Sequence, residues 1–277
     1  MNSEHFLTVI VLMVVTTALL TWIRWRYGRP ESKVAFVVLF PFCAVLLAAT
    51  GGFSWLTSSV IAGLGVGIGG LIALAIRKIA HHKTLYPLFP RRYNFDKRRD
   101  TLRKTLALLE ERGAKTLVET GVARRGLVGT RGDGASTVVF GLWAKQHDAR
   151  LDSVDIDPQA INMAAGALQD LGLNESVGLH TSDSVVFLEH YTQPVDFLYL
   201  DSYDYDLADA EVQSASQAHH LKEFQMIEPK LHENTVVLID DCKLPGGGKG
   251  KSVIAYMQER DWKIVLDDYQ VLLTRNS

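Results

Sequence analysis

Two short stretches decide the fold: residues 195–201, Val-Asp-Phe-Leu-Tyr-Leu-Asp, and residues 235–241, Thr-Val-Val-Leu-Ile-Asp-Asp. Each is a run of apolar, β-branched and aromatic residues that ends in aspartate, and such runs are typical of buried strands. Ligands of parallel sheets bind at the carboxyl ends of the strands. The acidic residues that end these two runs are therefore the first candidates for a functional site.

Strands and helices alternate on both sides of these stretches. Further strands are expected at 116–119, 151–156, 178–181, 262–266 and 270–274, with helices at about 102–112, 136–146, 158 onward, 184–190, 211–231 and 251–260. This alternation predicts an α/β fold with helices on both faces of a parallel sheet. We expect a Rossmann-like, doubly wound, mostly parallel sheet of about seven strands.

The bulk composition limits the possible functions. The chain has 277 residues, of which 47% are hydrophobic, and a formal net charge of −2. No long basic run is present, so we expect no nucleic-acid partner. The two cysteines, Cys43 and Cys242, form neither a disulfide framework nor a metal-type CxxC pair, which fits a reducing compartment.

Three uncharged apolar runs at 6–23, 34–50 and 53–76 predict membrane insertion, because about 20 apolar residues span a bilayer. We therefore expect a membrane anchor of about three transmembrane helices at 1–76, a basic juxtamembrane linker at 77–96 and the α/β domain at 97–277. Basic residues follow the first and third runs, and positive loops stay cytoplasmic. The expectation is an integral membrane protein that contacts membrane lipids, with its α/β domain facing the cytoplasm.

The first strand and its loop carry candidate ligand-binding residues. Glu119 and Gly121 end the strand, and Gly134 and Ser136 precede or begin the next helix. Glycine lets the backbone approach a ligand closely, and a helix N-terminus presents free N–H groups. An ordinary strand-to-helix turn would look similar, and the spacing departs from GxGxxG.

The second and third strands each end in acidic residues. Asp155 is expected to accept hydrogen bonds from ribose hydroxyls, whereas Asp157 is assigned to capping the following helix. Asp183 is a candidate for the adenine side of such a ligand, although a helix cap explains it equally well.

The fourth and fifth strands end in Asp201, Asp240 and Asp241. Three carboxylates at neighbouring strand ends would repel one another unless a cation joined them, and oxygen ligands suit Mg²⁺ or Ca²⁺. We therefore predict a divalent metal site, with Mg²⁺ as the expected ion. The alternative is that these aspartates are separate, solvated turn residues.

The order of these motifs resembles class I S-adenosylmethionine-dependent methyltransferases, over about residues 100–277. The similarity is greatest to metal-dependent O-methyltransferases of the catechol and macrolide-sugar types. The motifs that carry it are Val-Glu-Thr-Gly at 118–121, Ser-Val-Asp-Ile-Asp-Pro at 153–158, Thr-Ser-Asp-Ser at 181–184, Leu-Asp-Ser-Tyr-Asp-Tyr-Asp at 200–206 and Leu-Ile-Asp-Asp at 238–241.

The resemblance implies a role for each candidate residue. Glu119 and Gly121 would line the methionine end of the cofactor, Asp155 would hold the ribose and Asp183 would lie by the adenine. Asp201, Asp240 and Asp241 match the metal-ligand positions, and Asp201 is also a candidate for catalysis. The long stretch 122–133 departs from the family pattern.

Two further features have competing interpretations. His219 or His220 is a candidate general base, since imidazole titrates near neutral pH, although a packing histidine is the simpler interpretation. The glycine-rich loop at 246–251 resembles a phosphate cradle without the GxxxxGK[ST] spacing, and a flexible lid is the better interpretation.

The sequence thus predicts a membrane-tethered methyltransferase that uses S-adenosylmethionine and a divalent metal to methylate a hydroxyl of a small or lipid-linked acceptor. The alternatives are a non-catalytic nucleotide-binding or scaffold module, and another nucleotide-cofactor enzyme such as an NAD-dependent oxidoreductase. The missing GxGxxG argues against the latter. The sequence does not indicate an oligomeric state.

Overall fold

The computed structural model describes residues 83–275 of the chain. Two compact units are distinguished, and the second begins at Tyr93 and contains all the strands of the sheet. The three apolar runs at 6–23, 34–50 and 53–76 lie outside the described residues.

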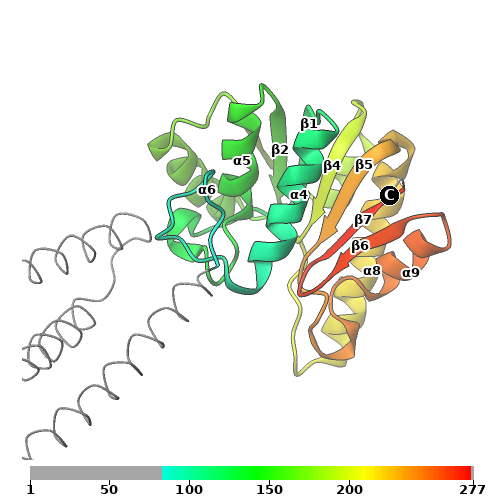
Figure 1. Cartoon of the computed structure of the whole chain (residues 1–277). Coiled ribbons are helices and arrows are strands. Elements are labelled where there is room, and N and C mark those ends of the chain that lie inside the picture. Colours follow the sequence, from blue (N-terminus) through cyan, green and yellow to red (C-terminus); the bar gives the residue numbers. More distant parts are fainter. Residues whose placement is uncertain (1–82, 276–277) are drawn as a thin grey trace, which may run out of the picture. The chain divides into compact units, whose positions relative to one another are not determined.

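The described helices and strands follow the alternation expected from the sequence (Figure 1). The helices are α4 (Arg99–Glu111), α5 (Ser136–Gln146), α6 (Pro158–Asp170), α7 (Ser184–Glu189), α8 (Ala210–Ile227) and α9 (Lys251–Gln258). The strands are β1 (Thr116–Thr120), β2 (Arg150–Asp155), β3 (Val177–Thr181), β4 (Val195–Leu200), β5 (Leu231–Ile239), β6 (Lys263–Asp267) and β7 (Val271–Thr274). Short 3₁₀ turns, η1 (Asp96–Arg98), η2 (Gly126–Gly129), η3 (Glu228–Lys230) and η4 (Pro245–Gly247), lie between them.

The strands form one seven-stranded sheet in the order β3-β2-β1-β4-β5-β7-β6. Strands β1 to β5 pair in parallel, and β7 runs antiparallel between β5 and β6. The predicted Rossmann-like, mostly parallel fold is confirmed. The strand order reverses at β1, so the carboxyl ends of β1, β2 and β4 meet where ligands of open α/β sheets bind.

Alternating side chains of β4 fill the core on both faces of the sheet. Phe197 and Tyr199 face α5, where their rings lie 4.6 Å and 5.4 Å from the ring of Phe140. Leu198 and Leu200 point the other way, into a cluster that α7, α8 and α9 close. Because both faces are covered, β4 reads as a continuous apolar run.

Two helix boundaries illustrate local control by the sequence. Asp157 caps α6 by accepting a hydrogen bond from the Gln159 backbone N–H, which confirms its assignment as a cap. The helix predicted at 211–231 ends earlier, at Ile227. Pro229 follows within η3, and proline cannot donate the backbone hydrogen bond that a helix interior requires.

In the part of the chain that the structure describes, no helix is long and apolar enough to cross a membrane. The longest of these helices, α8, has 18 residues, but polar and charged side chains interrupt it throughout, whereas a span needs about 20 predominantly apolar residues. The expected localisation, an integral membrane protein with its catalytic domain facing the cytoplasm, is contradicted by this finding. It is corrected for the described residues.

The packing of α5 on the sheet predicts a large effect of a single truncation. Phe140 is fully buried against two rings of β4, so Phe140→Ala is expected to lower the free energy of unfolding by about 3–5 kcal/mol. Urea denaturation of the full chain measures this. Val128, which is 93% exposed, supplies the control: Val128→Ala should change the free energy by less than about 0.5 kcal/mol. Equal effects of the two changes would refute this packing.

Candidate functional site

The carboxyl ends of β1, β2 and β4 are joined by backbone hydrogen bonds. The Gly121 N–H donates to the Val154 carbonyl at 2.8 Å, and the Asp201 N–H donates to the Thr120 carbonyl at 3.0 Å. Gly121 has a φ of +83°, and a Cβ at this position would lie 2.5 Å from the Asp201 carbonyl oxygen. Only glycine lets the two strand ends approach this closely.

Glu119 is a fully buried carboxylate beside this junction. The Ser153 hydroxyl donates to its Oε2 at 2.6 Å, whereas Oε1 is buried and has no hydrogen-bond partner among the described residues. Burial raises the pKa of Glu119 to about 7, although hydrogen bonds from Ser136 and Ser153 oppose the shift. A buried acceptor without a partner is costly, so this side chain is suited to a donor group of a ligand.

Asp155 is held in a fixed orientation at the end of β2. Its Oδ2 accepts a hydrogen bond from the Val122 N–H at 3.1 Å, and its Oδ1 accepts one from the Asp157 N–H at 2.9 Å. Each carboxylate oxygen retains a further lone pair. Asp155 is therefore oriented by the backbone and can still accept hydrogen bonds from a ligand.

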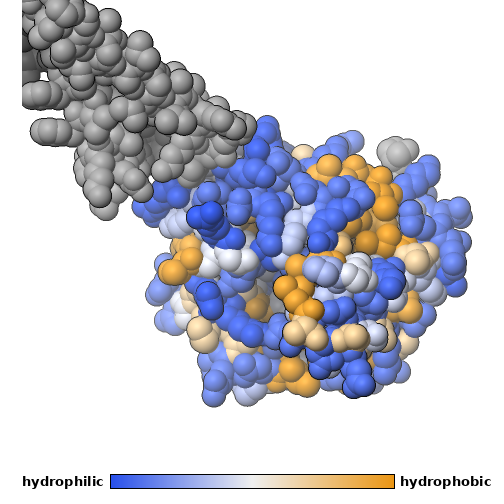
Figure 2. All heavy atoms as spheres, turned by 90° about the horizontal axis from the view of Figure 1, so that it is seen from below, coloured by the Kyte–Doolittle hydropathy of each residue, from blue (hydrophilic) through white to orange (hydrophobic). Residues whose placement is uncertain are grey.

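A cavity of about 430 Å³ opens in front of Asp155. Figure 2 shows the molecule from below, a mostly hydrophilic face with a hollow near the middle of the described domain. The volume lies within the range of small-molecule sites. The residues that line the cavity are Arg124, Val154, Asp155, Ile156, Asp157, Asp183, Ser184, Ser202, Tyr203, Asp204 and His219.

Asp183 caps α7, since its Oδ1 accepts hydrogen bonds from the Val185 and Val186 N–H groups at 2.8 Å and 3.2 Å. The capping interpretation is thus confirmed. Asp183 also lines the cavity, and its second oxygen, Oδ2, is not used by the cap. Its role at the adenine side of a ligand stays a prediction.

His219 lies on the Asp183 side of the cavity. Its Nε2 is 3.0 Å from the Ser184 hydroxyl and 3.4 Å from Oε1 of the buried Glu223. Burial lowers the pKa of His219, but the contacts with Glu223 outweigh this and raise it above the ordinary value. The other candidate base, His220, is fully buried, and burial lowers its pKa to about 4.

Gly134 and Ser136 lie at the start of α5, which no side chain caps. Gly134 has a φ of +80°, and a Cβ there would lie 2.7 Å from Cδ of Arg98. Ser136 is buried in the first turn of the helix. The loop that follows β1 thus exposes an uncapped helix start to the site and leaves room for an arginine side chain.

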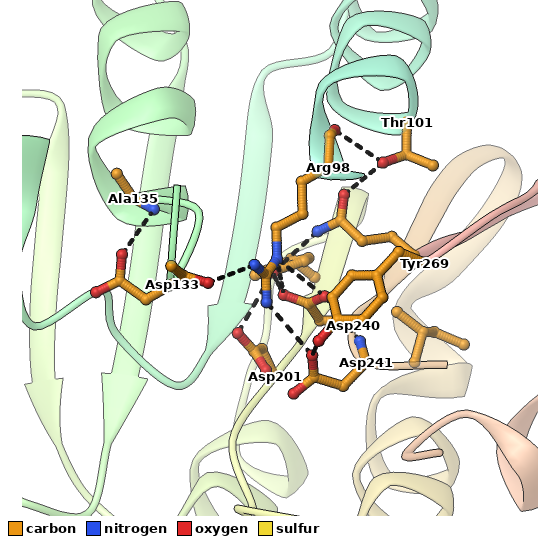
Figure 3. A network of polar contacts seen from close by, with 12 residues as sticks. Arg98, Thr101, Asp133, Ala135, Asp201, Asp240, Asp241 and Tyr269 are labelled. Carbon is orange, nitrogen blue, oxygen red and sulfur yellow. Dashed lines mark hydrogen bonds and ion pairs between the residues drawn. The ribbon is translucent and has the colours of Figure 1, made fainter. Parts of the chain in front are cut away.

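The three aspartates at the ends of β4 and β5 come together, as predicted, but two cationic side chains already bind them (Figure 3). The Arg98 guanidinium contacts Asp240 at 2.8 Å and Asp241 at 3.3 Å. The Lys249 ammonium contacts Asp201 at 2.6 Å and Asp241 at 3.5 Å. These ion pairs supply the positive charge that the sequence analysis expected from a metal.

Both cations are firmly charged. Burial opposes the charged form of Lys249, but Asp201 and Asp241 outweigh it and hold its pKa above the ordinary value. Burial likewise opposes the charge on Arg98, and Asp240 more than compensates and raises its pKa. Arg98 in turn lowers the pKa of Asp240, against the effect of burial.

The predicted divalent metal does not fit this arrangement. Asp201, Asp240 and Asp241 direct their oxygens at Arg98, Lys249 and two tyrosine hydroxyls. Within residues 83–275, no group of three or more histidine, cysteine, aspartate or glutamate side chains is arranged to hold a metal ion. The physical reason is that both cations came from parts of the chain distant in sequence.

The glycine-rich loop at 246–251 is not arranged as a free lid. The Gln217 amide donates to the carbonyls of Gly246 and Gly248 at 3.2 Å and 3.1 Å, and the Tyr205 hydroxyl donates to the Pro245 carbonyl at 2.6 Å. These bonds attach the loop to α8 and to the segment before it. The prediction of a flexible lid is therefore not supported.

Comparison with known families identifies the domain. A family model described as a methyltransferase domain matches residues 128–242. The chain carries a methyltransferase domain. The match confirms the enzyme class expected from the sequence, an S-adenosylmethionine-dependent methyltransferase.

Solved structures of similar fold are distant. A putative caffeoyl-CoA O-methyltransferase from Staphylococcus aureus is 15% identical over 64% of this chain and 82% of that chain, with a TM-score of 0.47. An SAH-bound methyltransferase from Podospora anserina is 14% identical over 64% and 78%, with a TM-score of 0.47. Likenesses this distant assign neither a substrate nor a site residue. No curated protein matches the sequence.

The sequence analysis missed two residues of the methyltransferase domain's strand-end cluster, Arg98 and Lys249. Arg98 lies in a basic stretch just before α4, and nothing in its local sequence distinguishes it from solvated neighbours. Lys249 had a signal: it is a lysine within a glycine run that closely follows Asp240 and Asp241.

The raised pKa of Glu119 predicts a pH-dependent stability of the methyltransferase domain. The folded domain holds this proton up to about pH 7, whereas the unfolded chain releases it near the ordinary value of 4.5. The contribution is therefore fully present below pH 4.5 and is lost as the pH rises through 7, up to roughly 3 kcal/mol in total. Urea denaturation between pH 5 and 8 should show this loss in the parent.

Glu119→Gln cannot titrate, so its stability should fall less steeply over the same range. The exposed Glu110 of α4 is the matched control, and Glu110→Gln should keep the parent's slope. An equal slope in Glu119→Gln and the parent would show that Glu119 does not hold a proton in the folded state.

Proposed function

We propose that residues 97–277 transfer a methyl group from S-adenosylmethionine to a hydroxyl oxygen of a small-molecule acceptor. The observation that carries the proposal is the placement of Asp155. It ends β2, is oriented by two backbone N–H groups and lines a cavity with Asp183 and His219, in a chain that carries a methyltransferase domain.

The residues of the cavity fit the cofactor. When bound, S-adenosylmethionine supplies a methyl group on a positively charged sulfur. Asp155 would accept hydrogen bonds from the ribose hydroxyls, and the unused oxygen of Asp183 would face the adenine. Oε1 of Glu119, buried without a partner, would accept a hydrogen bond from the ammonium of the methionine end.

His219 belongs to the cofactor side in this proposal. Its contacts with Ser184 and Glu223 hold the imidazole beside Asp183 rather than beside the strand-end carboxylates. Its predicted role as a general base is therefore replaced by a role in lining the adenosine site. Tyr203, whose ring centroid lies 5.3 Å from that of His219, extends the same wall.

Catalysis would depend chiefly on positioning. Methyl transfer is an in-line displacement, so holding the acceptor oxygen behind the methyl group supplies much of the rate. The rigid junction of Gly121 and Asp201 fixes the strand ends at which the two substrates would meet. Asp201 stays a candidate for contact with the acceptor. Its Oδ1 is paired with Lys249, whereas Oδ2 lies 3.3 Å from the Tyr199 hydroxyl.

Support for oxygen as the acceptor atom comes from the resemblance of the strand-end aspartates to those of O-methyltransferases. The direct experiment incubates the full chain with methyl-labelled S-adenosylmethionine and a panel of phenols, sugar hydroxyls and amines. Label in a base-stable ether product supports the proposal. Label in amine products alone would contradict oxygen as the acceptor.

Cofactor titration separates the methyltransferase from the other candidate functions. S-adenosylmethionine and S-adenosylhomocysteine should both bind in isothermal titration calorimetry, and NAD should not. Binding of NAD alone would favour an oxidoreductase. Binding of neither would favour a non-catalytic module.

Replacing Asp155 tests the assignment of the ribose site. Asp155→Ala should weaken S-adenosylhomocysteine binding by about 1.5–3 kcal/mol, or roughly 10- to 150-fold, because charge-assisted hydrogen bonds to the ribose are lost. Asp170→Ala removes an exposed carboxylate at the far end of α6 and should leave affinity unchanged. Equal affinity of Asp155→Ala and the parent would remove Asp155 from the site.

A further inference from the structure

We propose that Lys249 and Arg98 are built-in counter-ions that replace a divalent metal at the carboxyl ends of β4 and β5. The methyltransferase domain would then hold its strand-end carboxylates together without any metal ion. The proposal rests on the contacts of these two side chains and goes beyond the proposed reaction.

Lys249 occupies the position between strands that a bridging cation would take. Its ammonium lies 2.6 Å from Oδ1 of Asp201, at the end of β4, and 3.5 Å from Oδ2 of Asp241, beyond the end of β5. The side chain is only 3% exposed. A buried ammonium is costly unless it is paired, and a metal ion at the same point would meet this positive charge at close range.

The glycine-rich loop is built to bring Lys249 to this point. Gly248 has a φ of +59°, and a Cβ there would lie 2.0 Å from the Asp241 carbonyl oxygen. The Lys249 N–H donates to that same carbonyl at 3.3 Å, and Gln217 holds the carbonyls on the preceding side. The glycine run therefore has a structural purpose that neither a phosphate cradle nor a lid would explain.

Arg98 closes the cluster from the opposite side. Its Nε donates to both oxygens of Asp240, at 2.8 Å and 3.1 Å, and its Nη1 donates to the Gly132 carbonyl at 2.6 Å. The Tyr199 hydroxyl donates to Asp240 at 2.6 Å, and the Tyr269 hydroxyl donates to Asp241. In Figure 3 the side chains of Arg98, Asp240, Asp241 and Tyr269 converge on one another.

The charge balance of the cluster supports the same conclusion. At their ordinary protonation states, three carboxylates and two cations carry one net negative charge. The single positive charge of S-adenosylmethionine would neutralise it, and this step of the argument rests on the proposed function. A divalent ion in addition would leave excess positive charge in a site of low dielectric constant, which is unfavourable.

Removing Lys249 should convert the cluster into a metal site. In the full-length chain, Lys249→Met leaves Asp201 and Asp241 without their shared cation. We expect the melting temperature to fall by about 5–15 °C, as for a broken buried ion pair. Mn²⁺, followed by calorimetry and electron paramagnetic resonance, should then bind at one site per chain, and Mg²⁺ should raise the melting temperature again.

Lys251→Met is the matched control, because Lys251 is an exposed lysine two residues further along the same loop. The parent and Lys251→Met should bind no Mn²⁺ and should show no change in melting temperature with Mg²⁺. Binding of Mn²⁺ to the parent that Asp241→Asn abolishes would overturn the proposal. Failure of a folded Lys249→Met variant to bind Mn²⁺ would also overturn it.

A second variant covers the case in which Lys249→Met does not fold. The double change Lys249→Met with Asp201→Asn removes a cation together with its closest carboxylate. It should fold, melt above Lys249→Met and bind no Mn²⁺, because the charges are again balanced. If the double variant also failed to fold, Lys249 would be needed for packing rather than for charge, and the proposal would fall. None of these readouts depends on methyl transfer, so they remain informative whatever reaction the domain performs.

Discussion

The need to neutralise three carboxylates at neighbouring strand ends organises this half of the domain. Asp240 is fully buried, and Asp201 and Asp241 are largely so. Unpaired charges in this environment would cost several kcal/mol each. The chain meets the requirement with Arg98 from the start of α4 and with Lys249 from the loop before α9. The geometry of both segments follows from this task, as the left-handed conformations of Gly134 and Gly248 show.

The carboxyl edge of the sheet is thereby divided into two regions. On one side, Glu119, Asp155 and Asp183 keep oxygen atoms that the protein itself does not use. On the other side, the oxygens of Asp240 and Asp241 are taken up by Arg98, Lys249 and tyrosine hydroxyls. Unused acceptors are suited to a ligand, whereas paired acceptors are suited to holding strands together. Gly121 lies at the boundary, where its backbone closely contacts Asp201.

This division changes what the strand-end aspartates mean. In the sequence they look like ligands of a metal, since carboxylates alone cannot remain together. In the folded domain they are members of an ion-pair network whose rigidity positions the ends of β1 and β4. A methyltransferase domain gains from such rigidity, because its reaction depends on alignment of two substrates. The acidic pattern is thus compatible with methyl transfer in which the protein supplies its own cations.

Much of the domain could be predicted from local sequence. The apolar run at 195–200 is β4, the segment 136–146 is α5, and Asp157 caps α6, because periodicity, strand composition and capping act between residues that are close along the chain. The placement of Asp201, Asp240 and Asp241 at one edge also followed from the parallel topology. Only the tertiary structure decided what neutralises them. Arg98 and Asp240 are 142 positions apart, and Lys249 and Asp201 are 48 apart. An ion pair between such distant residues leaves no periodic signal in the sequence, since it depends on where the folded chain brings each charge rather than on the residues beside it.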